Sequence, residues 1–277
     1  MIRLPKPVVD IDAYIAAVVE ERQGGPNAVW FAGIRGDWST RCHHYDDAGG
    51  DPASLPSWDE AIAKKIRFKT LYASPLVGST QGVAISALRD RTMQFCPVCG
   101  EAGTPNTLDH YLPQDSYPHF SILPLNLVPT CDICQGHKLA KTIGPDGRLF
   151  LHPYFDTCLD NQVVRLRFHP PYATPTVELV CHPDVPDDWI GLVARHLAEL
   201  QLPVRLEKFF NKEFLRVLKL AKRARERGAD IATEVERFRD HAADRSLNSW
   251  EHLLWESACA DQALLNYLAM GDLPEHL

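Results

Sequence analysis

The sequence predicts an α+β protein, with a small central module between an N-terminal mixed region and a mostly helical C-terminal domain. Three observations predict this class. Two Cys-x2-Cys pairs bound a short segment, residues 96–134. Apolar and polar residues alternate over 163–168 and 176–180, as in half-buried strands, and from residue 187 onward the spacing of apolar residues is helical.

At 277 residues the chain is long enough to bury a substantial core and to form two or three modules. We predict three parts: an accessory region over 1–85, the cysteine-bounded module over 86–158, and a β-hairpin followed by helices over 159–277. The sequence contains no internal repeat and no low-complexity segment, so each part is expected to form its own packing.

In the N-terminal region, residues 11–22 have apolar side chains at helical spacing and are followed by a Gly-Gly-Pro sequence, which predicts a helix and its end. Ser57 and Glu60 stand three residues apart, as in a capping box, and predict a second helix over 59–72. In the C-terminal part we predict four helices: 187–201, 203–227, 230–245 and 247–269.

Composition and charge limit the function. The chain is 45% hydrophobic and 23% charged, as in ordinary globular proteins, and no apolar run approaches the ~20 residues that span a bilayer. The N-terminus lacks the apolar core of a secretory signal, so we expect a cytoplasmic protein with reduced cysteines and no membrane partner. A net charge of −7 argues against a generic nucleic-acid coat protein.

Positive charge is nevertheless concentrated locally. Residues 205–227 contain nine basic and three acidic side chains, and a smaller basic cluster lies between Lys64 and Lys69. Two interpretations stay open for both segments: a solvated helix face, or contact with phosphate.

Four cysteines predict a zinc site. Cys96 and Cys99 form one pair, Cys131 and Cys134 form the other, and 31 residues separate the pairs. Two such pairs supply the four thiolates of a tetrahedral zinc ion, and a closed four-thiolate site leaves no position for a substrate. We therefore expect a structural zinc. The other cysteines show no such pairing and are predicted to be ordinary thiols: Cys42, Cys158, Cys181 and Cys259.

The segment between the cysteine pairs carries Leu-Asp-His-Tyr-Leu-Pro at 108–113 and Asn-Leu-Val-Pro at 126–129, and the second pair is followed by Gln135. These residues resemble the HNH endonuclease family of the ββα-metal fold, in the branch with a four-cysteine zinc. The resemblance covers residues 96–138. It implies that Asp109-His110 ends a first strand, that Asn126 lies in or after the following loop, and that the next helix supplies a metal ligand.

The resemblance implies a role for each residue. His110 is the general base that activates water, for which a neutral imidazole is well suited near pH 7. Asp109 anchors a catalytic divalent ion, Mg²⁺ or another such as Mn²⁺ or Ni²⁺, which stabilises charge on the phosphate. Asn126 holds the loop that orients His110, and Lys138 is a substrate-binding candidate or a surface lysine.

The second metal ligand departs from the family pattern, because relatives carry His or Asn where this chain has Gln135. His137 is the alternative, but two residues along a helix rotate a side chain by ~200° away from the first position. We favour Gln135. A third hypothesis is that this site has lost its affinity for the catalytic metal and that the protein is inactive as a nuclease.

Two function classes follow. The first is a metal-dependent endonuclease that hydrolyses DNA, controlled by a protein partner as an antiviral-defence or restriction-like effector. The second is a catalytically inactive, zinc-containing adaptor that binds nucleic acid or protein. The Asp109-His110 pair favours the enzyme, because an adaptor needs no carboxylate beside a base. The sequence leaves the DNA preference, the kind of cut and the oligomeric state open.

Overall fold

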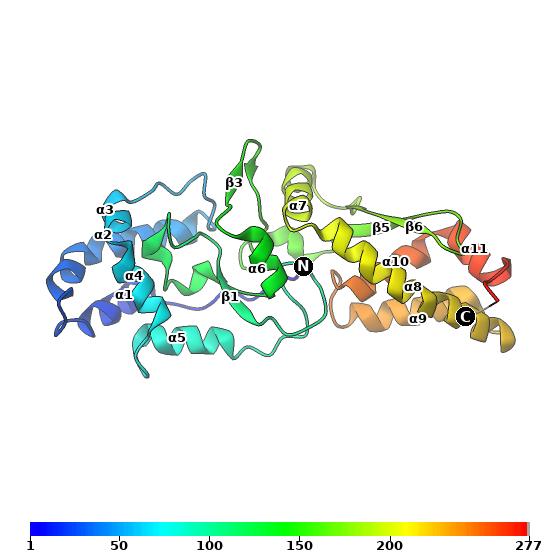
Figure 1. The fold of residues 1–277 in the computed structure, drawn as a ribbon, viewed down its shortest axis with the longest axis horizontal. Coiled ribbons are helices and arrows are strands. Elements are labelled where there is room, and N and C mark those ends of the chain that lie inside the picture. Colours follow the sequence, from blue (N-terminus) through cyan, green and yellow to red (C-terminus); the bar gives the residue numbers. More distant parts are fainter. Residues whose placement is uncertain (276–277) are drawn as a thin grey trace. The chain divides into compact units, whose positions relative to one another are not determined.

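The computed structural model describes residues 1–275, which divide into two compact units (Figure 1). The N-terminal unit comprises Arg3–Val98 and Gly103–Thr157. The C-terminal unit comprises Met1–Ile2, Cys99–Ala102 and the residues from Cys158 onward. The chain is α+β, with helices and three two-stranded antiparallel sheets in its described part. The predicted three-part boundaries stay predictions.

Helices precede every strand in the described part of the N-terminal unit: α1 (Ile11–Glu20), α2 (Ala28–Asp47), α3 (Asp59–Ala63), α4 (Lys65–Ala73) and α5 (Thr80–Arg89). The helix predicted over 11–22 is confirmed as α1. The capping box is wrong, because Trp58 is the N-cap of α3 and no side chain among the described residues caps that helix. The helix predicted over 59–72 is interrupted at Lys64, so it forms α3 and α4.

The core of this unit is aromatic. Phe31, Trp38 and Phe68 pack edge to face or tilted, with ring centroids 5.0–5.8 Å apart, and all three are buried. The Trp38 indole donates a hydrogen bond of 2.7 Å to the carbonyl of His119. Because His119 belongs to the loop that follows the first strand, this bond connects α2 to the loop on which the site depends.

A ββα segment follows the helices. β1 (Thr107–His110) pairs with β2 (Leu127–Thr130) in antiparallel register, with His110 opposite Leu127, and α6 (Asp132–Lys138) follows. The loop between the strands contains two short 3-10 helices, η1 (Pro118–Phe120) and η2 (Pro124–Asn126). A small hairpin, β3 (Ile143–Gly144) and β4 (Gly147–Arg148), comes next.

The C-terminal unit begins with η3 (Thr157–Asp160), which starts in the N-terminal unit, and a hairpin, and continues with helices. β5 (Val164–His169) and β6 (Thr176–Cys181) confirm the strands predicted from alternation. The helices are α7 (Asp187–Glu199), α8 (Leu202–Glu226), α9 (Ile231–Ala243), α10 (Trp250–Ala260) and α11 (Gln262–Met270). The single helix predicted over 247–269 is wrong, since Asp261 is extended and its side chain caps α11 at Leu264.

Packing in this unit follows from amphipathic helices. α8 buries one apolar face, with Leu206, Phe210 and Phe214 among its buried residues, and leaves most of its charged residues exposed. Arg225 is different: its guanidinium donates to three carbonyls at the end of α11, those of Tyr267, Leu268 and Gly271. These bonds satisfy acceptors that a helix terminus otherwise leaves unpaired. Across residues 1–275, none of the helices combines the length and hydropathy needed to cross a bilayer.

Candidate functional site

Four cysteine thiols gather at the start of α6. The Sγ atoms of Cys96, Cys99, Cys131 and Cys134 all lie within 4.8 Å of one another. Tetrahedral zinc–thiolate bonds of 2.3 Å place sulfur atoms ~3.8 Å apart. The cluster could therefore hold a metal ion such as zinc, as the spacing of the cysteines predicts. The remaining cysteines lie outside it: Cys42, Cys158, Cys181 and Cys259.

Polar hydrogens point at these sulfur atoms. The backbone N–H of Cys131 donates to Cys96 Sγ, and that of Cys134 donates to Cys131 Sγ, each at 3.4 Å. In the C-terminal unit, Arg205 Nη2 lies 3.5 Å from Cys99 Sγ. Donors stabilise a thiolate more than a thiol, so this environment suits sulfur that binds metal. Cys131 is also the N-cap of α6, and its sulfur fixes where the helix begins.

At the other end of α6, a buried ion pair joins the helix to β1. Lys138 Nζ lies 2.9 Å from Asp109 Oδ2 and donates a 2.8 Å hydrogen bond to the carbonyl of His110. The two residues are only 5% and 7% exposed. Burial raises the pKa of Asp109, and the Lys138 ammonium opposes that shift. The prediction that Lys138 is a surface lysine is therefore wrong. In this structure its ammonium pairs with the Asp109 carboxylate.

The two candidates for the second metal ligand differ in position. The side chain of Gln135 lies close enough to the Asp109 carboxylate to lower its pKa, so it lies at the site. His137 is half-buried on the same helix. In the described chain, only the four cysteines form a group of three or more His, Cys, Asp or Glu side chains close enough to share an ion. The structure thus brings Gln135, rather than His137, to Asp109.

His110 is the last residue of β1, and its ring is contacted at Nε2 by residues of the following loop. Its Nε2 lies 2.8 Å from the carbonyl of Ser121 and 2.9 Å from the Gln114 side-chain nitrogen. The Tyr72 ring meets the imidazole edge to face, with centroids 4.4 Å apart. Burial lowers the pKa of His110 to about 4, although the Ser121 carbonyl opposes the shift. The imidazole is therefore neutral at physiological pH.

Asn126 binds both sides of the loop that supplies the Ser121 carbonyl. Its Oδ1 accepts from the Leu112 amide at 2.7 Å, and its Nδ2 donates to the carbonyls of Leu112 and Phe120, at 3.0 and 3.2 Å. All of these contacts are buried, which makes a neutral amide the appropriate side chain. Asn126 therefore fixes the loop that orients His110 and does not itself contact the imidazole.

Several residues that support this arrangement were not predicted from the sequence. Tyr45, on α2, donates to Asn126 Oδ1 at 3.0 Å and lies 3.1 Å from His152 Nε2, so one hydroxyl connects two segments of the site. Gln114 and Ser121 reach His110 from the loop. Tyr45 is distant in sequence and belongs to no motif. Of these residues, Gln114 is the one whose contact the sequence could have suggested, because it lies only four residues after His110.

Other polar and aromatic residues of this unit have structural partners. His152 and Asp156 are buried and form a network: the His152 amide donates to Asp156 at 2.6 Å, and Arg148 pairs with Asp156 at 2.9 Å. Tyr117 lies in the loop, its ring stacked 6.2 Å from that of Phe120. His119 is 1% exposed and lies between aromatic rings.

One basic cluster lies near the site. Lys65 and Lys69, on α4, pair with Asp115 at 2.7 and 3.0 Å, and the positive charge of Lys69 is close enough to lower the pKa of His110. Each of the three side chains is at least 31% exposed. Part of the basic segment that begins at Lys64 thus lies beside the candidate base.

Comparison with known proteins gives one partial relative. Protein ea31 of Escherichia phage lambda is 40% identical to this chain over 62 residues, which are 22% of this chain and 21% of that protein. The chain thus matches about a fifth of the relative's length. No protein-family model matches the chain, and no solved structure matches it.

The burial of His119 predicts a pH dependence of folding. Within residues 1–275 neither ring nitrogen has a hydrogen-bond partner, and burial, with a smaller contribution from Arg41, lowers the pKa of His119 to about 3. The unfolded chain protonates this ring near pH 6.5, so below that value it binds more protons than the folded chain. The stability contributed by neutral His119 is therefore present above pH 6.5 and falls as the pH drops towards 3.

We expect His119→Phe, which keeps an aromatic ring, to gain stability relative to the parent protein by about 2 kcal/mol between pH 7 and pH 5. Urea unfolding at both pH values, followed by circular dichroism, measures this difference. His241→Gln, at an exposed position, is the control. A constant difference between the His119→Phe variant and the parent at the two pH values would contradict the assignment.

Proposed function

We propose that this protein is a metal-dependent endonuclease of the HNH kind that hydrolyses DNA phosphodiester bonds. The observation that carries the proposal is the placement of His110 at the end of β1, beside Asp109, with Nε2 against the Ser121 carbonyl. The ββα order of the surrounding elements also supports it.

The hydrogen bond at Nε2 determines the tautomer of His110. A carbonyl only accepts, so Nε2 carries the proton and Nδ1 presents a lone pair. That lone pair can take a proton from the attacking water. A pKa of about 4 keeps the ring neutral, and an anionic phosphate beside it would raise the pKa because it stabilises the imidazolium that forms. The loop that Asn126 binds places the Ser121 carbonyl at Nε2 and so holds the ring in this orientation.

The residues around Asp109 fit a hard divalent cation. A buried carboxylate requires positive charge nearby, and here the Lys138 ammonium supplies it. Asp109 would hold the ion, and Gln135 would join it through its carbonyl oxygen after a rotation of its amide. When bound, the ion supplies charge stabilisation at the phosphate and the leaving oxygen. Lys138, released from Asp109, can then contact a substrate phosphate.

The four-cysteine cluster takes a separate, structural role in this proposal. A zinc ion with four thiolate ligands has no open position, so it would contribute stability and no chemistry. It would hold the N-terminus of α6, and thereby the register that brings Gln135 and Lys138 to Asp109.

DNA as substrate and a controlling protein partner remain part of the proposal. Lys65 and Lys69 offer phosphate contacts beside His110, while the net charge of −7 suggests that a partner contributes to DNA recognition. A cytoplasmic effector in antiviral defence or restriction fits that control and rests on the family resemblance. The inactive adaptor is less well supported, because it leaves the oriented imidazole of His110 without a role.

Substitution of the base tests the nuclease. We expect purified protein to nick or linearise plasmid DNA with Mg²⁺, Mn²⁺ or Ni²⁺, and His110→Ala to lower the rate by roughly 10²–10⁴-fold because the general base is lost. His43→Ala, an exposed histidine elsewhere in the unit, is the control. Agarose gel assays with zinc content verified for each variant give the rates.

Equal rates in His110→Ala and the parent would contradict the assignment of the base. If the parent protein cuts with none of the ions, Gln135→Asn separates two causes. Recovered cleavage identifies a metal site weakened by glutamine. Continued inactivity identifies a missing partner or an adaptor function.

Replacement of Lys138 tests its competition with the cation. We expect Lys138→Met, which keeps an unbranched chain one atom shorter and removes the charge, to bind Mn²⁺ about 10-fold more tightly, because the ammonium no longer occupies Asp109. The ion-free variant should be less stable, since Asp109 is left buried without a counter-charge. Isothermal titration and urea unfolding measure the two effects, with Lys141→Met as the exposed control. Unchanged or weaker Mn²⁺ binding would contradict the competition.

Removal of one thiolate tests the zinc. Elemental analysis should find one zinc per chain, and Cys131→Ser should lose it, although serine can still cap α6. The loss of stability should be large, because structural zinc contributes on the order of 10 kcal/mol in zinc-finger peptides. Cys181→Ser, outside the cluster, should retain both metal and stability. A zinc-free parent protein would refute the structural role.

A further inference from the structure

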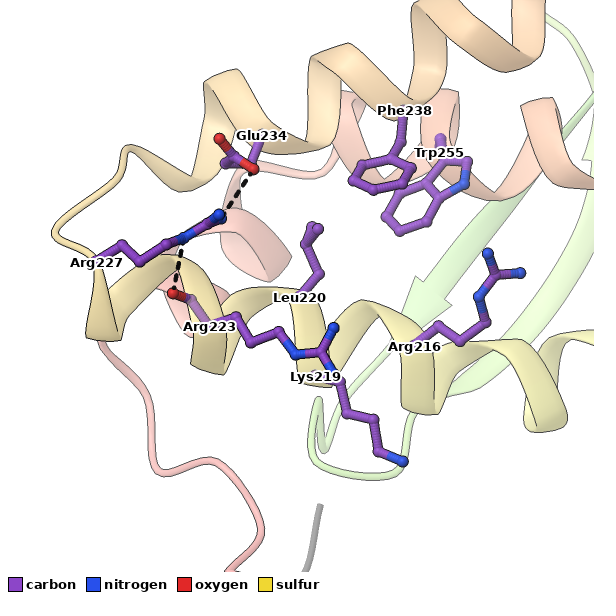
Figure 2. Close-up of a pocket in the computed structure, with 8 residues that line it drawn as sticks. All are labelled: Arg216, Lys219, Leu220, Arg223, Arg227, Glu234, Phe238 and Trp255. Atoms are coloured by element: carbon purple, nitrogen blue, oxygen red, sulfur yellow. Dashed lines mark hydrogen bonds and ion pairs between the residues drawn. The ribbon is translucent and has the colours of Figure 1, made fainter.

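A cavity of about 460 Å³ opens between α8, α9 and α10 of the C-terminal unit (Figure 2). Its volume lies within the range of small-molecule sites in proteins. It belongs to the basic segment 205–227 that the sequence left open between a solvated face and a phosphate contact. None of the residues assigned to the candidate nuclease site lines it.

Cations line one side of this cavity. Arg216, Lys219, Arg223 and Arg227 recur at helical spacing along α8 and just beyond it, against a single lining carboxylate, that of Glu234. Such spacing places them along one helix face. The lining therefore carries an excess of positive charge in a protein that is acidic overall.

Two of these cations are not committed to an ion pair. Arg216 pairs with Glu213 at 2.5 Å, and Arg227 pairs with Glu234 at 3.3 Å. The ion pairs of the described chain include neither Lys219 nor Arg223, and both side chains are exposed. They are the groups available to a phosphate.

Apolar side chains line the rest of the cavity. Figure 2 shows Leu220, Phe238 and Trp255 gathered between the helices. The rings of Phe238 and Trp255 stack with centroids 4.8 Å apart and planes 26° apart. Trp255 is only 3% exposed, whereas Phe238 and Leu220 are half-buried, so these two present the apolar surface that a ligand can touch.

We propose that this cavity binds a nucleotide, with the base against Phe238 and Leu220 and the phosphate on Lys219 and Arg223. Aromatic stacking beside a basic groove is the combination that binds nucleotides of single strands without reading sequence. A phosphate alone would not use the apolar wall, and an apolar ligand would not use the cations. The nucleotide is either free or part of a single strand, since both present the same chemistry.

The site stands independently of the proposed nuclease, so binding is measured with His110→Ala protein and no added divalent ion. The probe is 5′-fluorescein-labelled (dT)10, followed by fluorescence anisotropy at low salt, with dTMP and inorganic phosphate as competitors. The test variant is Lys219→Gln/Arg223→Gln. Its matched control is Lys208→Gln/Lys222→Gln, which removes two exposed charges of α8 outside the cavity. Phe238→Leu tests the stacking surface, after its fold is verified by circular dichroism.

We expect the test variant to bind (dT)10 at least 10-fold more weakly and the control less than 2-fold more weakly, with Phe238→Leu also weakened. Competition by dTMP, with weaker competition by phosphate, supports the site and shows that free nucleotide suffices. Binding of (dT)10 without competition by dTMP supports the site and identifies a single strand as its source. Equal losses in the test and control variants, equal competition by phosphate and dTMP, or no binding of either ligand would overturn the proposal.

Discussion

The candidate site depends on where helix α6 begins. Cys131 Sγ accepts the amide of Cys134 and so fixes the first turn, while the sulfur also belongs to the four-cysteine cluster. About one and two turns later, the same helix brings Gln135 and Lys138 to Asp109. A shift of one residue in the start of α6 would rotate both side chains by ~100° and separate them from β1. The cysteine cluster therefore controls the geometry of a site in which no cysteine takes part.

The buried Asp109 carboxylate imposes a second constraint. Removal of this group from water raises its pKa, so the folded protein must keep a cation beside it or leave it protonated. Lys138 meets that requirement from within the chain. In the proposed nuclease, a divalent ion would replace the ammonium beside this carboxylate.

Orientation of His110 depends on a network that starts far from it. Tyr45 on α2 supports Asn126, Asn126 fixes the loop, and the Ser121 carbonyl of that loop holds the imidazole. Each connection is a buried or partly buried hydrogen bond, so the loss of one partner leaves another polar group unsatisfied. The helices that precede β1 are therefore part of the site and not only an accessory to it.

What the sequence by itself determined is local. Three features were predictable: the two cysteine pairs, the strands at 163–168 and 176–180, and the helix from residue 11. Each depends on ligand spacing or on a periodicity of 2 or 3.6 residues, which a short segment of sequence is enough to reveal. The placement of Gln135 near Asp109 was implied by the family resemblance, and helical geometry only disfavoured His137.

Only the tertiary structure decided the burial of Lys138, the role of Tyr45, and the carbonyl that holds His110. The same holds for the cavity above α8, which needs Phe238 and Trp255 from two other helices. Each of these features depends on contacts between segments that are distant in sequence. No local period encodes such contacts, since they arise only when packing of the apolar core brings the segments together.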